Sequence, residues 1–170
     1  LKGALKHFTT SELLTGENRY NCPRCKKRSD ALKQMTIYKP PNILCFHLKR
    51  FQFANAFGGR IGKHIEFPIE FDLKEFISKG SEYYNGNNGV DKEGKEHCGS
   101  SLYHLYGVLV HSGHSLHSGH YYCYCRAADG KWYCFDDSSV SPVDIQQVLR
   151  QTAYILFYTR SQFESREPVS

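Results

Sequence analysis

The stretch Gly119-His120-Tyr121-Tyr122-Cys123-Tyr124-Cys125-Arg126-Ala127-Ala128-Asp129-Gly130-Lys131-Trp132-Tyr133-Cys134-Phe135-Asp136-Asp137 decides the fold. Two runs rich in aromatic and small residues flank Ala127-Ala128-Asp129-Gly130, which is a turn signal. This pattern predicts a β-hairpin. Its open end carries His120 on one strand, with Asp136 and Asp137 at the end of the other.

The length of the hairpin loop decides which residue faces His120. A five-residue loop over 126–130 places Asp136 opposite His120, and a four-residue loop places Asp137 there. A two-residue Asp129-Gly130 turn places Ser139 there instead. Directly opposed residues share one face of a sheet, with Cβ atoms about 4.5–5.5 Å apart. The hairpin is therefore able to pair the imidazole with a carboxylate.

A carboxylate beside a histidine fixes the tautomer of the ring and stabilises the imidazolium that forms when the ring takes a proton. His120 with Asp136 or Asp137 therefore fits a general base and its supporting acid. The alternative from spacing alone is an ordinary surface ion pair, which needs no catalytic role.

The length fits one domain, or one domain and a small lobe, and the composition favours strands. The chain has 170 residues, of which 40% are hydrophobic and 14% aromatic, and aromatic residues prefer strands. Its net charge of +5 comes from scattered lysines and arginines, which predicts solubility and no nucleic-acid partner. No apolar run approaches the roughly 20 residues that a membrane span needs, so no membrane partner is expected.

Among the seven cysteines, Cys22 and Cys25 alone have the spacing of metal ligands. A Cys-x-x-Cys turn brings two thiolates onto one tetrahedral ion, so we expect these two to form half of a structural zinc site. A redox pair is the alternative, but the strand and helix that surround such pairs are not indicated here. Unpaired cysteines fit a reducing compartment, and we expect a cytoplasmic or nuclear protein.

The remaining segments predict a mixed α+β chain. Residues 81–100 are polar and are expected to be a disordered insertion, and residues 111–119 a flexible loop whose histidines bind no metal. His47 is expected to be a core histidine in a central strand. The other predicted elements are a helix within Leu1–Leu14, a central strand at Ile43–Phe51, a short helix at Leu73–Ile77, a strand at Tyr103–Val110, a helix at Val143–Gln151 capped by Ser141-Pro142, and a buried strand at Ala153–Tyr158.

Several segments, taken in order along the chain, resemble one enzyme family. They are Tyr20-x-Cys22-x-x-Cys25, Leu44-Cys45-Phe46-His47-Leu48-Lys49-Arg50-Phe51, Phe67-Pro68, Tyr103 to Gly113, Ser118-Gly119-His120-Tyr121, Trp132-Tyr133-x-Phe135-Asp136-Asp137 and Ala153 to Tyr158. This ordered set is similar to the ubiquitin-specific proteases from about Leu5 to Tyr158.

The resemblance implies a papain-like cysteine protease with fingers, palm and thumb, which cleaves the bond after the C-terminal glycine of ubiquitin. His120 would be the general base, Asp136 the residue that orients it, and Asp137 a supporting polar residue. Cys22 and Cys25 would be the second half of the zinc site in the fingers. Residues 54–63 and 112–118 would lie over the ubiquitin tail. The implied partners are ubiquitin and its conjugates.

The chain also departs from the family pattern, because the box with the nucleophilic cysteine and the first zinc pair are absent. We therefore expect the C-terminal half of a catalytic domain that is inactive alone and lacks the thumb. Residues 1–38 would be part of the fingers, 39–160 the palm, and 161–170 a polar tail. The surface on which the thumb would dock could support a dimer. A ubiquitin-binding scaffold without activity is the alternative function.

Overall fold

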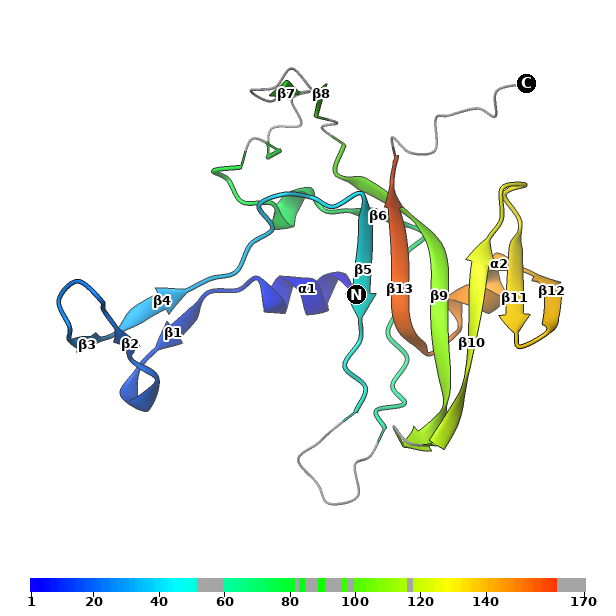
Figure 1. Cartoon of the computed structure of the whole chain (residues 1–170), viewed down its shortest axis with the longest axis horizontal. Helices are drawn as coiled ribbons and strands as arrows, with labels where there is room; N and C mark the ends of the chain where they lie inside the picture. Colours follow the sequence, from blue (N-terminus) through cyan, green and yellow to red (C-terminus); the bar gives the residue numbers. More distant parts are fainter. Residues whose placement is uncertain are drawn as a thin grey trace.

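The computed structural model describes residues 1–51, 60–81, 83–84, 89–90, 96–97, 100–115 and 118–161. Its main feature is a seven-stranded antiparallel sheet with the order β12-β11-β10-β9-β13-β5, in which β6 also pairs with β9 (Figure 1). The strands are β5 (Ile43–His47), β6 (Glu70–Asp72), β9 (Leu102–Ser115), β10 (Ser118–Arg126), β11 (Trp132–Asp136), β12 (Ser139–Val143) and β13 (Ala153–Arg160).

A second group of elements extends away from this sheet (Figure 1). We call it the β1–β4 extension. Strand β1 (Glu12–Leu14) pairs with β4 (Ala31–Lys33), and β2 (Tyr20–Asn21) pairs with β3 (Arg28–Ser29). The 3-10 helix η1 (Gly16–Asn18) lies between them, and helix α1 (Lys2–Phe8) leads into the extension. The predicted N-terminal helix is thus confirmed over a shorter span, and a strand follows it.

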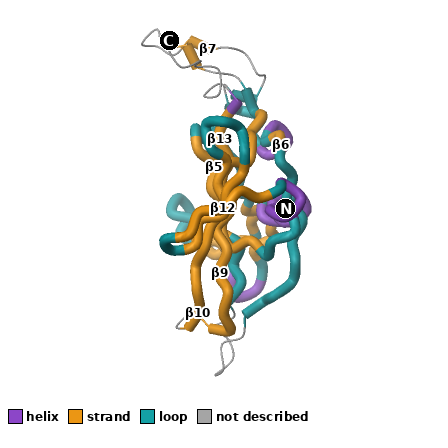
Figure 2. Tube along the Cα trace, turned by 90° about the vertical axis from the view of Figure 1, so that its right-hand side faces the viewer, coloured by secondary structure: helices purple, strands orange, loops and turns teal. Residues whose placement is uncertain are grey.

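The core lies on one face of the large sheet. Buried side chains from four strands, including Leu44, Val108, Tyr124 and Leu156, point to this face. The η2 segment (3-10 helix Lys74–Phe76) and helix α2 (Ile145–Leu149) cover it. Figure 2 shows the strands as one layer, with α1 and the β6–η2 segment on the same side. The mostly antiparallel mixed α/β class is therefore confirmed.

The opposite face of the sheet is more open to solvent. Alternate residues of β5 and β10 point away from the core, and among them Cys45 and His47 are exposed. Strand β5 is an edge strand, so the prediction of a central strand with a core histidine at His47 was wrong. A run of apolar residues cannot by itself distinguish an edge from a centre, because partners far along the chain decide the position.

The remaining predictions differ in their outcome. Strand β13 confirms the predicted C-terminal strand, and η2 the short helix. Helix α2 is capped by the Asp144 carboxylate, which accepts from the Gln146 N–H at 2.7 Å, so the predicted Ser141-Pro142 cap was wrong. Residues 111–115 and 118–119 belong to β9 and β10, so the predicted loop was also wrong there.

The polar segment 81–100 lies largely outside the described residues, and within it β7 (Gly89–Val90) pairs with β8 (Glu96–His97). The predicted polar tail also lies outside them, apart from Ser161. Among the residues that are described, no helix is long and apolar enough to cross a membrane.

Candidate functional site

The predicted hairpin forms, with a register that differs from every loop length considered above. Strand β10 pairs with β11 so that Cys123 faces Phe135 and Arg126 faces Trp132. The Ala127 N–H donates to the Lys131 carbonyl at 2.9 Å, which leaves Ala128, Asp129 and Gly130 as the turn. Gly130 takes a left-handed φ of 80° that suits a glycine. The register that was expected to place Asp136 directly opposite His120 was therefore wrong.

The His120 and Asp136 side chains nevertheless meet. Continuing the register puts Asp136 level with Tyr122, two residues along β10 from His120. A shift of two residues keeps side chains on the same face, and diagonal neighbours on one face lie within reach of long side chains. The Nε2 atom of His120 is hydrogen-bonded to Oδ1 of Asp136.

The immediate surroundings orient the His120 ring. His120 follows an irregularity in the pairing of β10 with β9 and lies opposite Ser112. Its ring stacks against Tyr122, with centroids 6.3 Å apart and planes inclined by 25°. The Tyr122 hydroxyl lies 3.4 Å from Oε1 of Gln151, which follows helix α2. The His120 ring thus contacts Asp136 of β11 and Tyr122 of β10, and Gln151 in turn contacts Tyr122.

The electrostatics of the pair favour the imidazolium. The hydrogen bond to Asp136, and then the charge of that carboxylate, raise the pKa of His120 above its ordinary value of 6.5. Both side chains are about half exposed, so solvent screens this attraction. Because Nε2 faces the carboxylate, Nδ1 is the ring nitrogen left to accept a proton from a nucleophile.

Asp137 lies in the two-residue turn that connects β11 to β12, since Asp136 pairs with Ser139. Its φ is +49°, a left-handed conformation that aspartate tolerates better than most residues. Ligand atoms of His120, Asp136 and Asp137 lie within 4.8 Å of one another. The three residues predicted at the open end of the hairpin are therefore brought together.

Cys22 and Cys25 lie in the β1–β4 extension, far along the chain from this site. The Lys26 N–H donates to the Cys22 carbonyl at 2.8 Å, and Lys26 takes a left-handed φ of 56°, which closes a tight knuckle. Hydrogen bonds from the backbone N–H groups of Cys25 and Arg24 lower the pKa of the Cys22 thiol. Two thiolates fit zinc, but no third ligand joins them in the described part of the chain.

One buried histidine was not singled out by the sequence. His111 lies at the end of β9 and is 1% exposed, with its ring 4.4 Å from that of Tyr121. A Cβ on Gly119 would lie 2.2 Å from Nε2 of His111, so only glycine fits beside it. In the sequence, the glycine directly before His120 was the available signal that another group lies close to this backbone.

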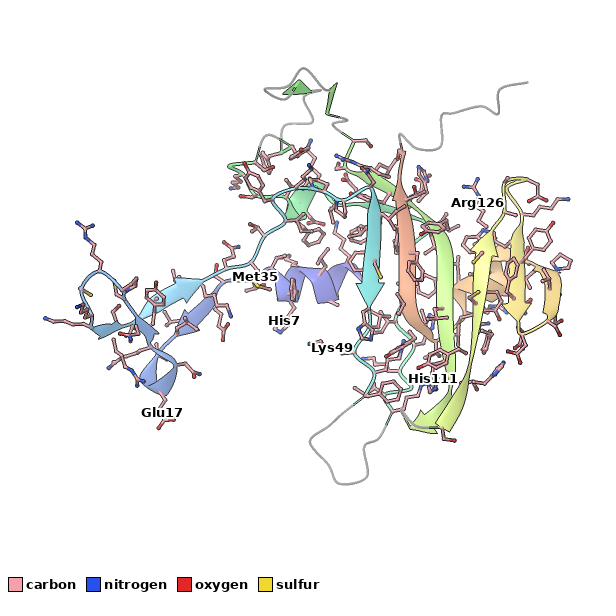
Figure 3. The ribbon with its side chains drawn as sticks, in the orientation of Figure 1. His7, Glu17, Met35, Lys49, His111 and Arg126 are labelled. Atoms are coloured by element: carbon pink, nitrogen blue, oxygen red, sulfur yellow. The ribbon has the colours of Figure 1, made fainter. Side chains whose placement is uncertain are left out.

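Figure 3 shows His111 and Arg126 at opposite ends of the sheet.

Comparison with known proteins identifies the family. The family model described as Ubiquitin carboxyl-terminal hydrolase matches residues 9–158. The chain belongs to this family. It is 44% identical over 165 residues to the probable ubiquitin carboxyl-terminal hydrolase 16 of Schizosaccharomyces pombe, covering 97% of this chain and 32% of that protein. It is also 44% identical over 158 residues to human ubiquitin carboxyl-terminal hydrolase 42, covering 93% and 11%.

Solved structures of the hydrolase family share this fold. The SAGA Ubp8/Sgf11/Sus1/Sgf73 DUB module bound to ubiquitin aldehyde contains a chain similar to this one, with a TM-score of 0.72 and 32% identity. The match covers 94% of this chain and 33% of that chain. The chain thus spans about one third of the length of that neighbour, and a third or less of the two curated relatives.

Proposed function

We propose that the protein containing this chain is a thiol-dependent deubiquitinase, which hydrolyses the peptide or isopeptide bond after the C-terminal glycine of ubiquitin. The hydrogen bond between His120 and Asp136 carries the proposal, because it joins a base to an orienting acid at an exposed end of the hairpin. The family membership and the neighbour bound to ubiquitin aldehyde support ubiquitin as the ligand.

In this mechanism His120 takes the thiol proton at Nδ1 while Nε2–H donates to Asp136. The resulting thiolate attacks the carbonyl carbon, and His120 returns the proton to the leaving amine. Water then hydrolyses the thioester with the same base. Asp137 adds negative charge beside the pair, which further raises the pKa of His120.

The chain itself is proposed to be inactive alone. Among the described residues no hydrogen bond joins His120 to a thiol. The half-buried Cys125, with a pKa raised to about 11 by burial and then by neighbouring Cys123, is a poor nucleophile. The attacking sulfur would therefore come from a part of the protein outside these residues.

Cys22 and Cys25 are proposed to supply two of four ligands to a structural zinc ion, whose role is to hold the β1–β4 extension together. The knuckle geometry and the lowered pKa of Cys22 support this assignment. Self-association through the surface on which the thumb would dock, and a cytoplasmic or nuclear location, also remain proposals.

Turnover of a fluorogenic ubiquitin C-terminal substrate tests the function. In the longer protein, His120→Gln is expected to lower kcat by about 100-fold to 10,000-fold, the range for loss of a general base. His7→Gln, at an exposed site on α1, is the matched control. Full activity of His120→Gln would overturn the assignment of the base. Turnover by the 170-residue chain alone would overturn only its proposed inactivity.

A further inference from the structure

Two arginines carry buried N–H groups that have no hydrogen-bond partner in the part of the chain that the structure describes. Arg50 is 2% exposed, and its Nε donates to the Ala153 carbonyl at 2.5 Å. Its Nη1 donates to the Ile61 and Lys63 carbonyls at 2.9 and 2.7 Å. Its Nη2 is buried and has no partner among the described residues, and neither does the buried Nε of Arg60. Buried polar atoms are nearly always hydrogen-bonded, so these two indicate a missing group.

The missing group should be negative. Burial, and then the charge of nearby Arg60, lower the pKa of Arg50. No ion pair within the described residues involves either arginine. Backbone carbonyls satisfy N–H groups but supply no net charge, and two like charges away from water are costly without a counter-ion. The planar guanidinium matches a carboxylate in shape and donor spacing.

The segment that holds the two arginines packs near His120. The ring of Phe51, which follows Arg50, lies 5.7 Å from the ring of His111, and His111 packs against Gly119, the residue directly before His120. Phe51 forms an isolated antiparallel bridge with Arg60, and the Ile61 N–H donates to the Arg50 carbonyl at 2.6 Å. Burial, and then the charges of Cys134 and Asp136, raise the pKa of Tyr122, and the charge of Arg60 acts in the opposite direction. The ring of Tyr122 stacks on that of His120. The charges of Arg60 and Asp136 therefore both act on a side chain that contacts His120.

We propose that Arg50 and Arg60 form a carboxylate-binding site, and that its ligand is the carboxyl terminus released by hydrolysis at His120. The identity of the ligand rests on the proposed function. Hydrolysis breaks the C–N bond, adds the hydroxyl of water to the acyl carbon and a proton to the amine, and leaves a carboxylate. In this site Arg60, which is half-buried, contacts the carboxylate, and Arg50, which is buried, supplies the second positive charge.

The first experiment tests the site in this chain with acetate as the probe. The thermal midpoint is measured in sodium acetate and in sodium chloride of equal ionic strength, because a ligand of the folded state raises it. Acetate also acts on proteins non-specifically, so the measured quantity is the acetate-dependent rise relative to Arg60→Gln. Arg19→Gln, which removes an exposed ion pair with Asp30, is the control.

We expect the rise to be larger in the wild type and in Arg19→Gln than in Arg60→Gln, with Arg60→Lys in between. An equal rise in the wild type and Arg60→Gln would overturn the site. This result does not depend on any enzymatic activity, so it separates the site from the proposed function.

The second experiment tests the source of the carboxylate. Labelled ubiquitin with a free carboxyl terminus and ubiquitin with an amidated terminus are titrated with the chain, and binding is followed by fluorescence anisotropy. We expect the free form to bind at least several-fold more tightly, and this preference to disappear in Arg60→Gln. Equal affinity, or no binding of either form, would overturn the product assignment and leave a site for small anions only.

Discussion

His120 and Asp136 are hydrogen-bonded although they are not directly opposite each other in the ladder, because Asp136 is level with Tyr122. The contact is diagonal and runs along one face of the hairpin. A register shift of one residue would move Asp136 to the other face of the sheet, whereas a shift of two keeps it on the same face as His120. The pair therefore depends on whether the shift is odd or even, more than on the length of the turn.

Replacing Asp136 by Asn should lower the pKa of His120 towards 6.5, since the carboxylate is the main cause of its rise. An NMR titration of the His120 ring protons measures the change. The pair stabilises the fold below about pH 6.5, and this contribution is lost as the pH rises through the higher folded-state pKa. Asp129→Asn, in the turn at the other end of the hairpin, should leave the pKa unaffected. An unchanged value in Asp136→Asn would show that the hydrogen bond does not persist in solution.

Adding a methyl group at Gly119 should destabilise the site end of the sheet. A Cβ there would lie 2.2 Å from Nε2 of His111 and 2.7 Å from the Ser112 carbonyl oxygen. Overpacking of this kind costs about 1–3 kcal/mol in the free energy of unfolding, measured here by urea denaturation. Gly80→Ala meets no atom within 4 Å and is the control. Equal stability of the two variants would contradict the close approach.

A β-branched residue at position 137 should strain the turn before β12. Asp137 has a φ of +49°, and a left-handed conformation costs about 1–2 kcal/mol for residues other than glycine, with aspartate partly exempt. Asp137→Val should therefore lower the free energy of unfolding by about that amount, whereas Asp137→Gly should not. Ser139→Val, at an exposed strand position, controls for the new side chain. The prediction fails if Asp137→Val and Ser139→Val are equally stable.

The thiols of Cys22 and Cys125 should differ strongly in reactivity. Backbone hydrogen bonds lower the pKa of Cys22, whereas burial and Cys123 raise the pKa of Cys125 to about 11. More thiolate is present at Cys22 at neutral pH, so iodoacetamide should alkylate it first in the zinc-free chain. Peptide mass spectrometry of timed samples at pH 7 measures both rates. Faster modification of Cys125 would contradict the burial of its thiol.

The Tyr158 hydroxyl should contribute measurably to stability. It donates to the Pro68 carbonyl at 2.7 Å from a fully buried ring in β13. Tyr158→Phe leaves that carbonyl without its donor, which costs about 1–2 kcal/mol. Tyr38→Phe, at a site that is 61% exposed, should cost almost nothing under the same urea titration. A cost that is equal in both variants would mean that water replaces the bond.

Local patterns predicted the hairpin and β13 well, because alternating aromatic residues and a Gly turn act over a few neighbours. They failed for β5, where a segment far along the chain decides, and for residues 111–115, where pairing with the next strand decides. His47 was expected in the core, yet β5 gains a partner from β13 alone and so remains at the edge. Residues 111–115 were expected to be a loop because of their Gly and Ser content, but pairing with β10 outweighs that weak preference.

The order of residues alone determined that a histidine and two acidic residues would come to one end of a hairpin, since strand alternation and a short turn require it. The folded structure decided which acid the imidazole meets, because the register of β10 against β11 puts Asp136 on the same face as His120 and two residues along from it. It alone also brought Arg50 to the Ala153 carbonyl at the start of β13 and Phe51 to Arg60, because these contacts join segments that are separated along the chain.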